Sequence, residues 1–164
     1  MDLLSRSEKK ASFWLQQESV DRPNKERIAD LLVKSKQGDP KDLLEAFCKE
    51  LTFGTAGLRG IVGIGTNKLN IFNARIAAQA LASSLLEDKK ETRKKKVVLS
   101  FDSRLSSRDL LAACVEVLSA NKIECFAFRD PTPTPLLSFA IREMQADAGI
   151  MITASHNPKD YNGL

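Results

Sequence analysis

The sequence predicts an α/β fold, a three-layer α/β/α sandwich around a mostly parallel (mixed) sheet, preceded by an N-terminal helical extension. Two observations carry this prediction. The first fifty residues show only helical periodicity, and from residue 97 onward short apolar runs of strand length alternate with amphipathic helices. Buried strands that alternate with helices are typical of a parallel sheet covered on both faces and joined by right-handed crossovers.

The helical extension is expected over residues 1–50. Ile28, Leu31 and Leu32 recur at helical spacing within it. Asp39 is predicted to cap a further helix, with Pro40 at its first position, where proline fits because that N–H has no intrahelical partner. We assign residues 51–164 to the α/β domain.

The stretch FGTAGLRGIVGIG (residues 53–65) contains five of the eight glycines in the chain. Glycine at this density lets the backbone approach a ligand closely or adopt positive φ. The stretch fits neither the G-x-x-x-x-G-K-[ST] nor the G-x-G-x-x-G nucleotide-binding pattern. On glycine content alone, a ligand-binding loop and a plain turn leading to a short strand near residues 58–63 explain it equally well.

The remaining elements are expected to alternate between helix and strand, beginning with a helix. They are predicted over residues 69–86, 97–101, 106–120, 122–128, 134–144 and 148–153. Ser106 and Asp109 are predicted to form a capping box, and Thr134 is predicted to cap the last helix, with Pro135 at its first position.

Three polar loops follow the predicted strands, at Asp102–Arg104, Arg129–Pro135 and Ser155–Pro158. In an open parallel sheet, ligands bind beyond the carboxyl ends of the strands. The fold therefore predicts that these loops converge on one edge.

The last of these loops lies in TASHNPKDYNGL (residues 153–164), where Asn162-Gly163 reads as a turn. A serine hydrolase is disfavoured there, because adjacent side chains of an extended backbone point to opposite faces, which separates Ser155 from His156. The G-x-S-x-G signature is also missing. A phosphoryl carrier suits Ser155 better, since phosphoserine needs backbone N–H groups and cations such as Arg59 and Arg104, usually with a divalent metal.

The motifs TASHNPKDYNG and FGTAGLRG together resemble the α-D-phosphohexomutases, specifically the phosphoglucomutase/phosphomannomutase branch. SFDSR (residues 100–104) resembles a third family motif, although family members often have Gly-Tyr at the positions of Ser100 and Phe101. The N-terminal stretch FWLQQESVDRPNKERIADLL is similar to the helical extension of the longer members.

The resemblance implies the first domain of a four-domain phosphosugar mutase. Ser155 would carry the phosphate and provide one ligand to Mg²⁺ through it, and Arg59 would lie in the phosphoryl-transfer site. His156 and Asn157 would line the site, with His156 either shaping the loop or assisting proton movement, and Arg104 would belong to the surrounding shell. Phosphate would move between C1 and C6 of a hexose, as in glucose 1-phosphate and glucose 6-phosphate, with glucose 1,6-bisphosphate as the intermediate and activator.

The family's Asp-x-Asp-x-Asp metal loop, sugar-selecting loop and distal phosphate-binding loop belong to later domains, and this sequence contains nothing like the metal loop. We therefore expect contacts with those later domains, and no catalysis by residues 1–164 alone. Mannose phosphate or pentose phosphate is the near alternative substrate, and a non-catalytic binding or regulatory protein with the same domain fold is the alternative of another class.

Composition restricts the other partners. The net charge of +4 owes much to the run KKETRKKK (residues 89–96), which could contact nucleic acid or act as an import signal. No aromatic residues are interleaved with it, so we favour a solvated surface loop and expect no nucleic-acid partner. Three widely spaced cysteines and a single histidine disfavour a His/Cys metal cage. Without an 18-residue apolar run or a signal peptide, the chain is predicted to be cytoplasmic, with no membrane partner.

Overall fold

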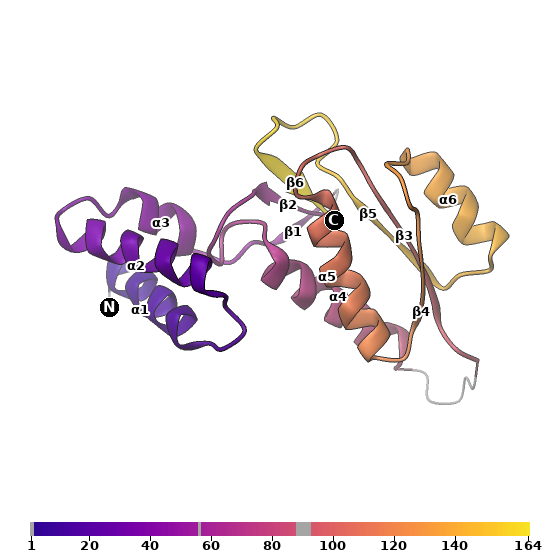
Figure 1. The fold of residues 1–164 in the computed structure, drawn as a ribbon, viewed down its shortest axis with the longest axis horizontal. Coiled ribbons are helices and arrows are strands. Elements are labelled where there is room, and N and C mark those ends of the chain that lie inside the picture. The colour runs from indigo at the N-terminus through magenta and orange to yellow at the C-terminus, as the bar shows by residue number, and fades with distance from the viewer. Residues whose placement is uncertain (1, 56, 88–92) are drawn as a thin grey trace.

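The computed structural model describes residues 2–55, 57–87 and 93–164. It confirms the predicted fold class: a sheet between two helical layers, with three further helices at one end of the molecule (Figure 1). No helix in the described ranges is both long enough and apolar enough to cross a membrane.

The N-terminal helices are α1 (Leu3–Gln16), α2 (Arg22–Lys36) and α3 (Lys41–Phe47). Aspartate side chains cap the first two, because Asp2 accepts a hydrogen bond from Ser5 N and Asp21 accepts one from Asn24 N. The predicted start of α3 is wrong by one residue. Pro40 is the N-cap, and Asp39 makes only a long contact of 3.4 Å with Lys41 N.

These helices share a small apolar core that includes Ala11, Ile28, Leu43 and Phe47, and this core also reaches Phe72 at the start of α4 (Ile71–Leu85). Trp14 contacts Phe47 and Phe72 edge to face, with ring centroids 5.7 Å and 5.2 Å away. The backbones meet as well. Asn67 N donates to Ala46 O of α3 at 2.9 Å, and Leu51, the first residue after the extension, donates its N–H to Thr66 O at 2.8 Å. The extension is therefore attached by both side chains and main chain.

The strands form two three-stranded sheets, ordered β4-β3-β5 and β1-β2-β6. Their bounds are β1 (Phe53–Gly54), β2 (Gly57–Ile61), β3 (Lys96–Phe101), β4 (Glu124–Ala127), β5 (Ala148–Ile152) and β6 (Tyr161–Gly163). The first sheet is parallel and the second antiparallel. Thr153 N donates to Gly163 O at 2.9 Å and links β5 to β6. The predicted turn at Asn162-Gly163 is wrong, because both residues lie in a strand paired with β2.

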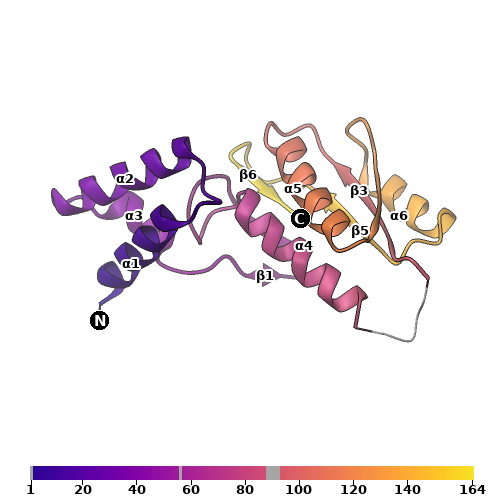
Figure 2. The ribbon, with the colours of Figure 1, turned by 60° about the horizontal axis from the view of Figure 1, so that its bottom comes forward.

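The helices α4 and α5 (Ser107–Ala120) lie on one side of the parallel sheet, and α6 (Thr134–Glu143) lies on the other, as Figures 1 and 2 both show. Alternate side chains of β3 serve the two sides. Val97, Leu99 and Phe101 join the core beneath α4 and α5, whereas Val98 lies on the side of α6. All four are buried, which explains the continuous apolar run in the sequence.

Two predicted helix starts also need correction. The capping box at Ser106 does not form, since Ser106 Oγ accepts a hydrogen bond from Asn162 Nδ2 at 2.9 Å and makes no cap bond. Helix α6 begins at Thr134 itself, with Pro133 as its N-cap. At Ser106 the hydrogen bond from the distant Asn162 overrides the capping signal, and at Thr134 the preceding proline is the N-cap instead.

The cysteines Cys48, Cys114 and Cys125 are free. Cys114 on α5 is buried in the core, and burial, with a smaller contribution from Cys125, raises its pKa to about 12. Residues 89–92 of the basic run lie outside the described residues. Arg93, which is described, forms a two-bond ion pair with Asp147 at 2.6 Å and 3.1 Å.

Candidate active site

Ser155 lies just beyond the carboxyl end of β5, on the edge of the sheet where the sequence predicts the site. Its side chain is exposed, and its φ of +55° places it in the left-handed region that residues other than glycine, asparagine and aspartate seldom occupy. Its N–H donates to Thr153 Oγ1 at 3.0 Å. The loop therefore presents the serine hydroxyl at the surface on a tightly turned backbone.

Arg104 ties this loop to the end of β3. Its Nη1 donates to the carbonyls of Pro158 and Tyr161 at 2.6 Å and 2.8 Å. Its Nη2 donates to the carbonyls of Asn157 and Ser155 at 2.7 Å and 3.1 Å. With the Nε bond to Asp102 at 3.1 Å, all five N–H groups of this guanidinium have protein acceptors. The geometry makes Arg104 a holder of the serine loop, and a direct contact with phosphate stays a prediction.

The carboxylate of Asp102 accepts four hydrogen bonds. Oδ1 accepts from Ser107 Oγ at 2.7 Å and from Arg104 N at 3.0 Å, and Oδ2 accepts from Thr153 Oγ1 at 2.7 Å and from Arg104 Nε at 3.1 Å. Burial raises the pKa of Asp102, but these hydrogen bonds and the positive charge of Arg104 lower it by more, so that it lies below its usual value. The group is an anion at neutral pH.

Arg59 approaches the loop from β2. Its Nη1 lies 3.4 Å from Asn157 Oδ1, while its Nε is buried without a hydrogen-bond partner among the described residues. The side chain crosses Gly163, its partner in the ladder with β6. A Cβ there would lie 2.7 Å from Thr153 O, 2.8 Å from Arg59 Cγ and 2.9 Å from Leu58 O. Glycine is thus required at that position, and Arg59 retains an unused donor beside the serine loop.

His156 corrects one premise of the sequence analysis. Because Ser155 is left-handed and not extended, the two side chains are close, with Ser155 Oγ 3.4 Å from His156 Nδ1. That distance exceeds the roughly 2.6–3.2 Å expected between a nucleophile and its base. Within the described part of the chain, no acidic side chain hydrogen-bonds the exposed imidazole. A hydrolase triad still lacks its third member.

Of the three predicted loops, the structure joins two directly, Asp102–Arg104 and Ser155–Pro158. The third, Arg129–Pro135, is hydrogen-bonded to β3 through Thr132 N, which donates to Phe101 O at 2.9 Å. It shares the sheet edge, since β4 and β3 are parallel.

Sequence analysis placed Asp102 in a polar loop at this edge but gave it no role, and it missed Thr153 and Asn162. Asn162 is completely buried, and its Nδ2 donates to Ser106 Oγ and Ser107 Oγ, both at 2.9 Å. The only signal in the sequence was the position of Asp102 and Thr153 directly after apolar strands. Nothing local marks Asn162, because its partners are more than fifty residues away.

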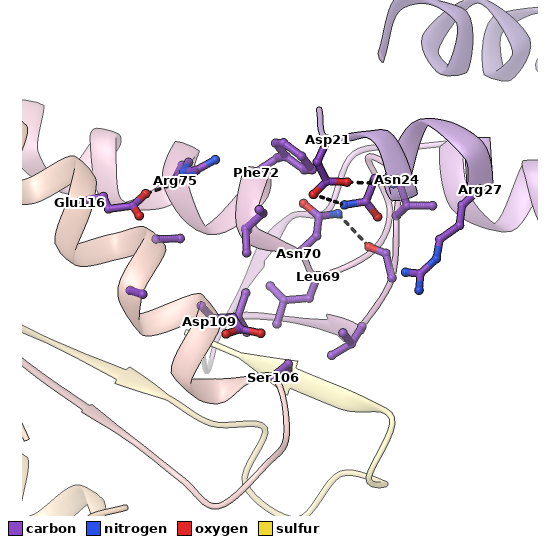
Figure 3. A pocket seen from close by; sticks show the side chains of 17 residues that line it. Asp21, Asn24, Arg27, Leu69, Asn70, Phe72, Arg75, Ser106, Asp109 and Glu116 are labelled. Atoms are coloured by element: carbon purple, nitrogen blue, oxygen red, sulfur yellow. Dashed lines mark hydrogen bonds and ion pairs between the residues drawn. The ribbon is translucent and has the colours of Figure 1, made fainter. Parts of the chain in front are cut away.

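A cavity of about 480 Å³ lies between the start of α2, the start of α4 and helix α5 (Figure 3). Asp21, Asn24 and Arg27 line it from α2, and Phe72 and Asp109 line it from the other two helices. Its wall includes Ser106, which is also hydrogen-bonded to Asn162. The cavity is separate from the exposed serine, which lies on an open surface.

The described residues do not build a metal site of their own. Among residues 2–55, 57–87 and 93–164, no group of three or more His, Cys, Asp or Glu side chains could hold a metal ion. The acidic residue nearest the serine loop in the hydrogen-bond network, Asp102, already accepts four hydrogen bonds. The residues present therefore fit a metal only through an oxygen carried by Ser155, with further ligands from elsewhere.

Fold and site together define an α/β/α domain that presents an exposed serine hydroxyl on a left-handed turn, held by one arginine and flanked by another. The family model described as phosphoglucomutase/phosphomannomutase, alpha/beta/alpha domain I, matches residues 50–164. The chain belongs to this family.

Relatives of known name agree. The phosphoglucomutase of Staphylococcus aureus strain USA300 is 41% identical over 141 residues, which are 85% of this chain and 25% of that protein. The phosphoglucomutase of the bovine strain RF122 is 40% identical over the same shares. The chain thus spans about a quarter of the length of the curated relatives it matches.

Two solved structures are similar. The crystal structure of a putative phosphomannomutase from Thermus thermophilus has a TM-score of 0.63 and 33% identity, covering 70% of this chain and 25% of that one. A phosphoglucomutase/phosphomannomutase family protein from Burkholderia thailandensis has a TM-score of 0.54 and 30% identity, covering 65% and 23%.

Proposed function

We propose that the protein carrying this chain is a phosphohexomutase that interconverts glucose 1-phosphate and glucose 6-phosphate through a phosphoserine at Ser155. Residues 51–164 would be its first domain and residues 1–50 a helical extension. Family membership supports the class of reaction. The observation that carries the assignment of the carrier is the exposed Ser155 hydroxyl on its left-handed turn, next to an arginine with an unused donor.

The chemistry suits a phosphate carried at this position. Phosphoserine has a charge of about −1.5 to −2 at neutral pH. Arg59 offers a guanidinium whose buried Nε has no partner among the described residues, and guanidinium groups bind phosphate oxygens strongly and directionally. Because Arg59 Nη1 lies 3.4 Å from Asn157 Oδ1 in the serine loop, we expect this guanidinium to contact a phosphate carried by Ser155.

The reaction is two phosphoryl transfers. Phosphoserine donates its phosphoryl group to the C6 hydroxyl of glucose 1-phosphate, which loses its proton, and Ser155 Oγ is left as the free hydroxyl. The glucose 1,6-bisphosphate then reorients. The C1 phosphoryl group returns to Ser155 Oγ, whose proton is released, and glucose 6-phosphate departs with its C1 hydroxyl restored.

In this proposal Mg²⁺ stabilises the charge of the transferring phosphoryl group when it is bound. From this chain it would be held through the phosphate oxygen of Ser155 alone, with its other ligands outside residues 1–164. Asn157 would orient Arg59 through its side-chain oxygen, and Arg104 would hold the loop. His156 would either shape the loop or move a proton at Ser155 Oγ.

We further propose that residues 1–164 alone do not catalyse the reaction. Ser155 and His156 are exposed on an open edge, and a transferase must keep water from the phosphoserine, which requires a closed cleft. Uncatalysed phosphate-monoester hydrolysis is so slow that enzymes accelerate it by up to ~10²¹-fold. The later parts of the protein would close over the sugar, and we expect it to act in the cytoplasm.

The carrier is tested by intact mass spectrometry of the full-length protein. We expect a population heavier by one phosphoryl group, about 80 Da, that is absent from Ser155→Ala together with mutase activity. Ser84→Ala, at an exposed position on α4, is the matched control and should keep both. Unchanged turnover in Ser155→Ala would refute the carrier role. A lack of activity in the wild-type protein and in both variants would favour a non-catalytic protein.

The role of Arg59 is tested by kinetics. Arg59→Ala should lower kcat/KM by about 10²–10³-fold, the loss typical when a donor to a developing charge is removed. Arg22→Ala is the control, because Arg22 is 90% exposed and forms only a surface pair with Glu26. Equal kcat/KM in the two variants would remove Arg59 from the site.

Mannose phosphate or pentose phosphate is the second candidate substrate. The similar Thermus thermophilus structure is described as a putative phosphomannomutase, so mannose 1-phosphate should be assayed beside glucose 1-phosphate. The larger kcat/KM identifies the substrate, because discrimination between sugars is a ratio of these constants.

A further inference from the structure

We propose that Asp102 is the positioning residue of the serine loop, and that it fixes the peptide backbone of Ser155 through Thr153 on one side and Arg104 on the other. This inference rests on the proposed function of Ser155 as phosphoryl carrier. It adds a role for two residues, Asp102 and Thr153, that carry no phosphate and contact no sugar.

The backbone of Ser155 needs to be held in place. Its φ of +55° is disfavoured for an L-residue with a Cβ, so it persists only where surrounding groups determine it. Both of its main-chain polar groups have defined partners. The N–H donates to Thr153 Oγ1, and the carbonyl accepts from Arg104 Nη2.

Hydrogen-bond direction shows that the N–H side depends on Asp102. The Ser155 N–H can only donate, and the ionised Asp102 carboxylate can only accept. Thr153 Oγ1 lies between them, 3.0 Å from the first and 2.7 Å from the second. Its hydroxyl proton must therefore point to Asp102 Oδ2, which leaves a lone pair for the Ser155 N–H. Without the carboxylate this hydroxyl would be free to rotate.

The carbonyl side depends on the same carboxylate. Asp102 Oδ2 accepts from Arg104 Nε at 3.1 Å, and this bond orients the guanidinium whose Nη2 reaches Ser155 O. The arginine side chain is only 15% exposed, which limits its alternative positions. One oxygen atom of Asp102 thus controls both ends of the Ser155 residue.

The other oxygen anchors Asp102 to the strand next to Arg59. Asp102 Oδ1 accepts from Ser107 Oγ, which must then accept from Asn162 Nδ2 at 2.9 Å. Asn162 Oδ1 accepts from Gly163 N at 2.8 Å, and Gly163 pairs with Arg59 in the ladder between β2 and β6. The serine and the arginine are therefore set by one connected network, which also includes Ser106 at the edge of the cavity in Figure 3.

This arrangement predicts an effect on turnover and not on substrate affinity. The network sets the direction of Ser155 Oγ, which matters in the transition state, whereas it offers no free donor to a bound sugar. Thr153→Val removes the hydroxyl and keeps the shape. We expect kcat to fall by about tenfold or more with KM unchanged, as for the loss of one hydrogen bond to a charged group.

The experiment measures kcat, KM and melting temperature for the full-length enzyme and four variants. Thr153→Ser keeps the hydroxyl and should restore most of kcat, while Asp102→Asn, which places an N–H₂ among four donors, should lower it at least as much as Thr153→Val. Thr66→Val is the matched control. It removes a hydroxyl that donates to Lys49 O at 2.7 Å far from the serine loop, so it should lower stability and leave kcat unchanged.

The outcomes separate this inference from the proposed function. If the wild-type enzyme carries no phosphate on Ser155 and converts no sugar phosphate, the proposed function fails. If the wild-type enzyme does both and Thr153→Val keeps its kcat, or Thr153→Ser loses as much as Thr153→Val, the positioning role of Asp102 is overturned. A fall in kcat shared equally by Thr66→Val would also overturn it, because the effect would then be general destabilisation.

Discussion

The carboxylate of Asp102 stabilises the folded chain through its hydrogen bonds. It is 23% exposed, and four hydrogen bonds hold it in its ionised form. Burial raises its pKa, but hydrogen bonds from Ser107, Thr153 and Arg104 lower it more. Since the folded pKa is lower than that of the unfolded chain, the stabilisation is complete above the unfolded value of about 3.9. It is lost as the pH falls through the folded value.

This gives a prediction for stability against pH. The free energy of unfolding of the wild-type chain should exceed that of Asp102→Asn by about 1–3 kcal/mol at pH 7. The difference should shrink as the pH falls below about 4. Urea unfolding at several pH values measures it. Asp147, whose pKa is also below its usual value, is present in both proteins and cancels. A difference that stays constant down to a pH of about 2.5, well below the ordinary aspartate pKa, would contradict the assignment.

The sequence could predict the place of Ser155 but not the residues that hold it. A serine that follows a buried strand by three residues must lie at the carboxyl edge of a parallel sheet, and the structure puts it there. The contact of Ser155 with His156 was misjudged because φ at Ser155 is set by Thr153 and by Arg104, which is 51 residues away. Such long-range hydrogen bonds leave no local pattern.

Among the helices and strands, too, the sequence predicts elements with a local pattern and misses those set by distant residues. The strands β3 and β5 were predictable from their continuous apolar runs. In β3 all residues from Val97 to Phe101 are buried, and in β5 Ile150 and Ile152 are buried. The strand β6 was not, because Asn162-Gly163 is a turn signal that the pairing with β2 overrides. Glycine is required at Gly163 by the close approach of Thr153 O, Leu58 O and Arg59 Cγ, not by a turn.

Gly38 and Gly65 allow a test of how closely α3 packs against the loop before α4. Gly38 and Gly65 both have positive φ, +98° and +122°. A Cβ on Gly38 would meet nothing within 4 Å, whereas one on Gly65 would lie 2.3 Å from Ala46 O, a backbone atom of α3. We expect Gly38→Ala to lower the free energy of unfolding by about 1–2 kcal/mol from backbone strain alone.

For Gly65→Ala we expect a loss of at least about 3 kcal/mol, because a clash with the main chain adds to the strain and forces α3 away from the loop before α4. Urea unfolding of the two variants provides the comparison, each serving as the control for the other. Similar losses in the two variants would show that α3 and the loop before α4 can move apart at no cost in the free energy of unfolding.

At the scale of the whole molecule, the question is whether its two apolar cores unfold together. One core lies among α1, α2 and α3, and the other lies between the parallel sheet and helices α4 and α5. Trp14, the single tryptophan, contacts Phe72 of α4, so its fluorescence reports the junction, while circular dichroism reports all helices. Because rings and main-chain hydrogen bonds both bridge the cores, we expect the two signals to share one urea midpoint.

Phe72→Ala should separate the two urea midpoints, with Trp14 fluorescence changing at a lower urea concentration than circular dichroism. The reason is that the edge-to-face contact at 5.2 Å is lost and a cavity is left at the junction. Phe139→Ala is the matched control, since Phe139 lies on α6 and is 54% exposed, so its loss leaves the junction intact and the midpoints together. Separate midpoints in the wild-type chain would mean that the extension unfolds on its own. In that case the junction contacts hold the helices in place without coupling their stability to the sheet that carries Ser155.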